Sequence, residues 1–99
     1  MSVATGIISF GETISVRRRG SVLLPCLAVG VPPLERKWYG PEGKAVVGDP
    51  FHLQSNGSLL ISDIQRQHQG NYNCSVNNAH GSDEISYFLR VLGKVHWRI

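Results

Sequence analysis

Three features of the sequence predict an all-β domain, built as a sandwich or a barrel of seven or eight short strands. Apolar and polar residues alternate in short runs, which is typical of strands that bury one face. Turn-forming Gly, Pro, Asn and Asp separate these runs at regular spacing. No convincing apolar stripe has the 3.6-residue period of a helix.

Alternation assigns an inward face to each strand in order along the chain. In the last but one strand, Asn71, Asn73 and Ser75 point outward. The inward residues, with their period of two, form four groups: Val22, Leu24 and Cys26; Leu59 and Ile61; Tyr72, Cys74 and Val76; and Ile85, Tyr87, Leu89 and Val91. The one helical possibility, residues 62–69, is too short to be stable alone.

Gly, Pro and Asn mark the connections between strands. We expect loops at residues 30–33 and 40–44 and a turn at 48–50. Asn56-Gly57 lies between two strand-like runs and predicts a hairpin, because both residue types tolerate a positive φ. Residues 77–81 predict a second hairpin turn. The sequence shows no internal repeat and no second domain.

Length and composition fit one small folded domain. Of 99 residues, 41% are hydrophobic and 17% are charged, which suffices for a thin core and argues against disorder. No apolar run approaches the ~20 residues that span a bilayer, so we expect no membrane insertion. The net charge is +3, but Lys94 and Arg98 supply two of the ten basic residues. We therefore expect no nucleic-acid binding.

The chain has two cysteines, Cys26 and Cys74. They do not form a metal-binding pattern, because there is no C-x-x-C and the four histidines are scattered. We therefore expect no metal and no cofactor. From the residues alone, the cysteines are either two buried thiols or one disulfide.

The spacing of four residues resembles the immunoglobulin fold. Trp38 follows Cys26 by twelve residues, Cys74 follows Cys26 by 48, and Tyr72 precedes Cys74 by two. The resemblance implies a two-sheet sandwich with an inter-sheet Cys26–Cys74 disulfide. Trp38 would pack against the sulfurs in a core shared with Leu59, Ile61 and Tyr72, and the Tyr72 hydroxyl would bond back to the chain. Closing this loop would stabilise the domain by about 4 kcal/mol.

Longer stretches are similar to the I-set immunoglobulin consensus over residues 3–92, which leaves residues 93–99 as a C-terminal tail or linker. Residues 56–61 resemble its G-S-L-x-I motif, and residues 70–81 its G-x-Y-x-C-x-x-x-N-x-x-G motif. Residues 8–11, 55–58, 77–78 and 81–85 resemble the Down syndrome cell adhesion molecule (Dscam) family, most of all its last immunoglobulin module. That module lies among fibronectin type III domains.

Three features depart from the family pattern. His68 replaces the usual Asp, and residues 49–52 lack its usual Arg partner, so we expect a packing contact in place of an ion pair. Arg36 replaces an apolar residue two positions before Trp38. Either its stem lies along the core edge, or Leu34 takes over the inward role. The tail 93–99 lacks the expected proline-bearing linker and is either an unusual exon end or sequence added in cloning.

Few residues carry signals of chemistry. There is no catalytic motif, so we expect no enzyme activity, and we interpret His52, His68, His80 and His96 as exposed. Asn56-Gly57-Ser58 is a sequon, and we expect a glycan on Asn56. Asn73-Cys74-Ser75 also fits, but it adjoins the cysteine, so we do not expect a glycan on Asn73.

Arg17, Arg18 and Arg19 are a candidate site for a sulfated glycan such as heparan sulfate, or for an acidic headgroup. Within a strand, however, successive side chains point to opposite faces. We therefore favour a solvated edge that discourages strand pairing between molecules.

The resemblance implies an extracellular module of a single-pass adhesion receptor that recognises identical copies on other cells. Its partners would be such a copy or neighbouring immunoglobulin and fibronectin III modules, with this module a spacer or contact element. Residues 1–5 are no signal peptide, so an extracellular protein would be a piece of a longer chain, with Met1 a cloning start. The alternative is an intracellular I-set module of a giant sarcomeric protein.

Overall fold

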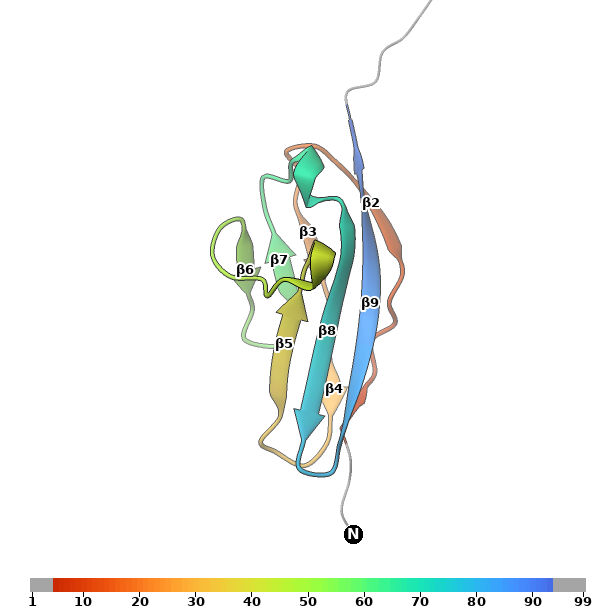
Figure 1. Ribbon diagram of the computed structural model, residues 1–99, viewed down its shortest axis with the longest axis vertical. Helices are drawn as coiled ribbons and strands as arrows, with labels where there is room; N and C mark the ends of the chain where they lie inside the picture. Colours follow the sequence, from red (N-terminus) through yellow and green to blue (C-terminus); the bar gives the residue numbers. More distant parts are fainter. Residues whose placement is uncertain (1–4, 94–99) are drawn as a thin grey trace, which may run out of the picture.

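Two β-sheets pack face to face in the computed structural model, which describes residues 5–93 (Figure 1). The larger sheet has four strands, in the order β2 (Thr13–Arg17), β9 (Gly81–Leu92), β8 (Gly70–Asn78) and β5 (Glu35–Tyr39). The smaller sheet has three strands, β3 (Val22–Leu24), β7 (Leu59–Ile61) and β6 (Phe51–Leu53). A short pair joins β1 (Gly6–Ile7) to β4 (Ala28–Val29). The predicted sandwich is confirmed.

Strand pairing is antiparallel except between β2 and β9, which run parallel. The register of β5 against β8 places Trp38 opposite Cys74. The register of β2 against β9 places Arg17 opposite Leu92, at the end of the domain where β9 stops. β1 lies toward the opposite end (Figure 1). Within the described residues, no helix has the length and apolar character needed to cross a membrane.

The core consists of the inward residues of both sheets. Alternation is clearest in β8, where Tyr72, Cys74 and Val76 are fully buried while their neighbours are not. Among residues 5–93, twelve hydrophobic residues are buried: Leu24, Cys26, Trp38, Leu59, Ile61, Ile64, Tyr72, Cys74, Val76, Tyr87, Leu89 and Val91. Trp38, Leu59, Ile61 and Tyr72, which the sequence assigns to the core, are all in this set.

Both predicted hairpin turns are present. Between β6 and β7, Gly57 has φ +92° and the backbone N–H of Ser58 donates to Asn56 Oδ1 at 2.9 Å. Between β8 and β9, the N–H of His80 donates to Asn78 Oδ1 at 2.9 Å. The helical possibility at residues 62–69 is reduced to one 3₁₀ turn, η2 (Arg66–His68), because Ile64 is drawn fully into the core.

The expectation that His68 is exposed is wrong, because its side chain closes η2. His68 is half-buried, and its Nδ1 accepts a hydrogen bond from the N–H of Gln65 at 2.8 Å. Its ring meets the ring of Phe51 edge-on, with centroids 6.0 Å apart. The predicted packing contact in place of an ion pair is therefore confirmed. His52 and His80 are exposed, and His96 lies outside the described residues with most of the tail.

Candidate interaction sites

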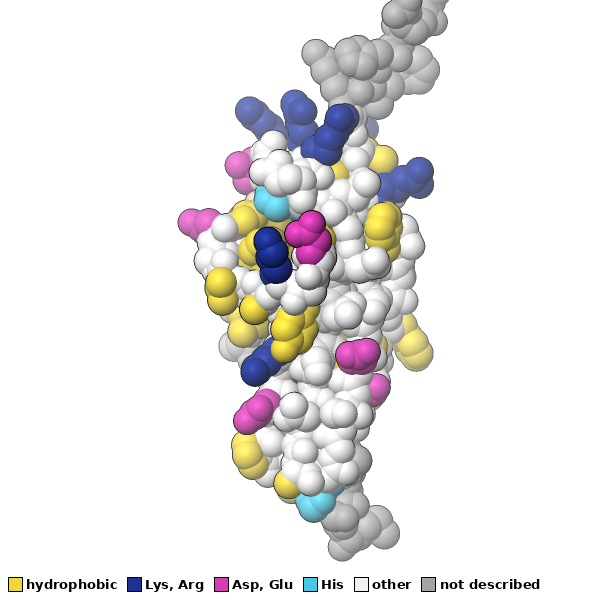
Figure 2. Space-filling model, viewed as in Figure 1, with side chains coloured by type: hydrophobic (Ala, Val, Ile, Leu, Met, Phe, Trp, Pro, Cys, Tyr) yellow, Lys and Arg dark blue, Asp and Glu magenta, His cyan; other side chains and the backbone are white. Residues whose placement is uncertain are grey.

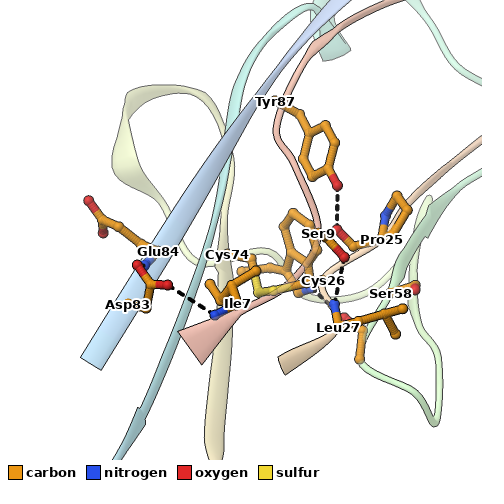
Figure 3. Close-up of a disulfide and its surroundings, with 12 residues drawn as sticks. Ile7, Ser9, Pro25, Cys26, Leu27, Ser58, Cys74, Asp83, Glu84 and Tyr87 are labelled. Atoms are coloured by element: carbon orange, nitrogen blue, oxygen red, sulfur yellow. Dashed lines mark hydrogen bonds between the residues drawn. A yellow bond between two sulfur atoms is a disulfide. The ribbon is translucent and has the colours of Figure 1, made fainter. Parts of the chain in front are cut away.

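A disulfide joins the two sheets at the centre of the core (Figure 3). Cys74 lies in β8 and Cys26 lies between β3 and β4, with their Cα atoms 6.5 Å apart and both side chains fully buried. Trp38 is the cross-strand neighbour of Cys74, so the indole and the bridge share one core layer. The predicted Cys26–Cys74 disulfide is confirmed, and neither sulfur is available as a nucleophile or metal ligand.

Two buried tyrosines tie the strands to neighbouring backbone. The Tyr72 hydroxyl donates to the carbonyl of His68, as the resemblance implied, and burial raises the pKa of Tyr72 to about 12. The Tyr87 hydroxyl donates to the carbonyl of Pro25, beside Cys26. Burial, and then the charge of Glu12, raise the pKa of Tyr87 above its ordinary value. The second bond was not predicted, although an inward tyrosine in a strand calls for such a partner.

Trp38 and Arg36 both contact the hairpin turn at Gly57. The indole N–H of Trp38 donates to the Gly57 carbonyl at 2.9 Å. A Cβ on Gly57 would lie 2.3 Å from Arg36 Cζ, so the guanidinium rests directly on this glycine. Leu34 packs against the core. Arg36 is half-buried on the same face of β5 as Trp38, and Leu34 supplies the apolar contact, so both alternatives for Arg36 apply.

A groove opens between the free edges of the two sheets, with a volume of about 490 Å³. β5 and β6 form its sides, and the segment 45–48 crosses it. Val47 and Leu53 at its rim are 81% and 64% exposed. The sequence did not predict this groove, because its lining comes from separate segments that only the fold brings together. The groove offers mainly apolar contacts, and Arg36 and Lys37 lie at one side of it.

The predicted glycosylation residue lies at an accessible position. Asn56 is exposed in the β6–β7 turn, and its Oδ1 accepts the Ser58 N–H. Asn73 is half-buried in β8, where its Oδ1 accepts the Ser86 hydroxyl at 2.6 Å. The turn therefore offers room for a glycan that the Asn73 position does not.

The expectation that Arg17, Arg18 and Arg19 point to opposite faces is wrong, because β2 ends at Arg17. Arg18 and Arg19 belong to the following turn, where Arg19 has φ +72°, and all three side chains are exposed. Basic side chains gather at this end of the molecule (Figure 2). Among residues 5–93, no group of three or more His, Cys, Asp or Glu could hold a metal ion.

The fold and the disulfide define the class of protein. The sequence profile described as "Immunoglobulin domain" matches residues 6–78, and the chain belongs to this family. Immunoglobulin domains of adhesion molecules are non-catalytic, so the prediction that the chain is not an enzyme is confirmed.

The chain is related to immunoglobulin domains of cell adhesion molecules. Over 90 residues the chain is 34% identical to "Cell adhesion molecule Dscam1" of Drosophila melanogaster, covering 91% of this chain and 4% of that protein. It is 38% identical over 87 residues to Dscam2 of the same organism, covering 86% and 4%. Human DSCAM is 34% identical over 89 residues, again covering 86% and 4%. The chain thus spans a small part of these relatives' length.

Solved structures agree with the fold. The neural ectodermal development factor IMP-L2 superposes with a TM-score of 0.86 and 31% identity, covering 92% of this chain and 46% of that one. A titin M10–obscurin like 1 immunoglobulin complex gives a TM-score of 0.85 at 20% identity, covering 95% and 99%. At that identity, the likeness to titin shows the fold alone.

Proposed function

We propose that the chain is an extracellular immunoglobulin module of a single-pass adhesion receptor of the Dscam type, most like the last such module. In the parent, which recognises identical copies on other cells, this module is a spacer or contact element beside neighbouring immunoglobulin and fibronectin III modules. The observation that carries the proposal is 34–38% identity to Dscam proteins over 86–91% of the chain.

The closed disulfide supports the extracellular location. Disulfides persist in oxidising compartments and are rare in the cytosol. The bridge between Cys26 and Cys74 is fully buried, which fits a structural role rather than a redox role. An intracellular sarcomeric module would not depend on such a bridge, and the similarity to titin stays at the level of fold.

The shape of the domain and its polar outer face support a spacing role. β1 and the end of β9 lie toward opposite ends, so the module suits a serial array (Figure 1). Asn71, Asn73 and Ser75 make the outer face of β8 polar. A polar face of this kind favours weak contacts that depend on many copies over one tight contact.

A glycan on Asn56 belongs to the same proposal. The side chain is exposed in the turn between β6 and β7, and Asn56-Gly57-Ser58 has the acceptor pattern. The turn lies beside Leu53 and Leu59, which line the groove, so a glycan there would cover apolar surface.

The first test is the mass of the chain secreted from animal cells, before and after reduction and alkylation. We expect no free thiol before reduction, two free thiols after it, and a mass increment that peptide N-glycosidase removes. Asn56→Gln is the matched control. It should lose the mass increment of the glycan and give the same thiol counts as the unchanged chain. Two free thiols in a folded, secreted sample would overturn the extracellular proposal.

A second test separates spacing from recognition. Beads densely coated with the 99-residue chain should remain dispersed if the module is a spacer, whereas a contact element that depends on many copies should aggregate them. Aggregation of these beads, in the absence of any other module, would show direct self-recognition and would refute the spacing role. Beads coated with Asn56→Gln show whether a glycan masks such a contact.

A further inference from the structure

Five arginines gather at the end of the domain where β9 stops. We call Arg17, Arg18, Arg19, Arg66 and Arg90 the arginine end. Backbone contacts bring them together: the Arg18 N–H donates to the Leu92 carbonyl at 3.1 Å, and the Arg19 N–H donates to the Ile64 carbonyl at 2.6 Å. All five side chains are exposed, and Figure 2 shows basic side chains crowding this end.

The arginine end follows a curved band over three elements. Arg17 in β2 and Arg90 in β9 share the outer face of the larger sheet, because Arg17 pairs with Leu92 and Arg90 pairs with Ser15. Strand geometry places these two Cα atoms about 8 Å apart. Arg18 and Arg19 continue the band through the turn. Arg66 completes it from η2, with its guanidinium beside Gly93.

These arginines lack acidic partners among residues 5–93. The ion pairs within that range join Lys44 to Glu42 and His52 to Asp49, both away from the arginine end. Asp63 precedes Ile64, whose carbonyl accepts the Arg19 N–H, and is therefore counted with the band. Counted with Asp63, this end has a net charge of +4, while the other described residues carry three basic and six acidic side chains. Such separation of charge favours capture of an anion.

The backbone beneath the band is held in place. Besides the bonds of Arg18 and Arg19, the N–H of Ile64 donates to the Gly20 carbonyl at 3.0 Å, and the N–H of Val91 donates to Gln69 Oε1 at 3.0 Å. η2 is therefore tied to both the β2–β3 turn and β9. Guanidinium groups bind sulfate or phosphate oxygens through paired N–H donors, and the fixed backbone beneath them need not be ordered on binding.

We propose that the arginine end binds a linear sulfated polysaccharide of the heparan sulfate type. The proposal rests on the extracellular location proposed above. A flexible chain of sulfates can follow a band that curves from the sheet face over the turn to η2. Anionic lipids concentrate in the cytoplasmic leaflet, so an extracellular module would meet a sulfated polysaccharide rather than such a surface. The sequence singled out Arg17–Arg19, and the fold adds Arg66 and Arg90.

The test is binding of the 99-residue chain to heparin over a series of salt concentrations. We expect retention that weakens steeply with salt, because bound cations displace condensed counterions. Arg18→Gln/Arg66→Gln should weaken binding about 25-fold, from about fivefold for each arginine, the effect of one basic residue near an anionic surface. Chemically desulfated heparin should not bind.

Two control variants remove the same charge elsewhere. Lys37→Gln/Lys44→Gln should change heparin binding by less than about threefold, the screened effect of distant charge. Lys94→Gln/Arg98→Gln, which removes charge from the tail, should weaken binding less than the arginine variant does. If either control variant weakened heparin binding as much as Arg18→Gln/Arg66→Gln does, the proposal would be overturned, because net charge or the tail would then explain the binding. Arg17→Gln/Arg90→Gln replaces the first variant if that one does not keep the native melting temperature.

Two other results would overturn the proposal of a polysaccharide site. No retention of the wild-type chain on heparin would overturn the proposal without touching the spacing role. Tighter binding to phosphatidylserine vesicles than to heparin would overturn it in favour of a membrane contact. Because heparin binding is measured on the isolated chain, its failure is distinct from a failure of the disulfide test for the extracellular location.

Discussion

Removing the Cys26–Cys74 bridge should destabilise the domain more than any single surface change. The bridge closes a loop with a sequence separation of 48, which corresponds to about 4 kcal/mol of lost chain entropy in the unfolded state. A typical domain has about 5–15 kcal/mol of stability. Cys26→Ala/Cys74→Ala should therefore lower the melting temperature by at least about 15 °C, at about 4–8 °C per kcal/mol.

The assay is urea unfolding at equilibrium, followed by tryptophan fluorescence. The oxidised wild-type chain, the double variant and the reduced wild-type chain are compared. Reduction leaves both sulfur atoms in the core, so the reduced wild type reports the loss of chain constraint, while the variant adds the loss of buried sulfur contacts. Both should have a higher m-value than the oxidised protein, because an unbridged unfolded chain exposes more surface.

Two results would refute this reasoning. If the free energy of unfolding fell by less than about 1 kcal/mol, loop closure of this length would not be the main contribution of the bridge. If the reduced wild type were as stable as the oxidised protein while only the variant lost stability, the sulfurs would act through packing alone. Both samples must show native near-UV circular dichroism before unfolding.

Two further predictions concern the core and the β6–β7 turn. Burial raises the pKa of Tyr72 to about 12, so the folded state favours the neutral phenol. The contribution of this phenol to the free energy of unfolding is complete below about pH 10, where the unfolded tyrosine titrates, and is lost toward pH 12. Tyr72→Phe should unfold at a lower urea concentration at neutral pH and lose less stability between pH 10 and 12, which urea titrations at each pH will check. Gly57→Ala should cost about 1–3 kcal/mol, because φ is +92° and the new methyl would meet Arg36. Urea midpoints measure the loss, and an equal loss in Ser55→Ala, a neighbour that is exposed in the same turn, would contradict this explanation.

Strand assignments could be predicted from the sequence because side chains in a strand have a period of two. The inward residues of β8 and β9 alternate over a long run, so chance is a poor explanation of the pattern. Residues 62–69 could not be predicted as well. That segment has no clear period, and only the core that receives Ile64 decides its path.

The expectation that strand alternation continues through Arg17–Arg19 failed for a related reason. Alternation holds only while a strand continues, and nothing local shows that β2 ends at Arg17. The parallel pairing with β9 and the bonds to Leu92 and Ile64 decide where the turn begins. Arg66 and Arg90 enter the same band through contacts that are remote in sequence.

Patterns in the chain determined the fold class and the two hairpin turns, and the resemblance to the immunoglobulin fold implied the disulfide between Cys26 and Cys74. These depend on the two-residue period, on the spacing of Cys26, Trp38, Tyr72 and Cys74, and on residue types that accept a turn. Only the tertiary structure decided the His68–Phe51 contact, the Arg36 guanidinium over Gly57, the groove and the arginine end. Each of these depends on the register between strands and on burial, which are properties of the packed sheets and not of any single segment.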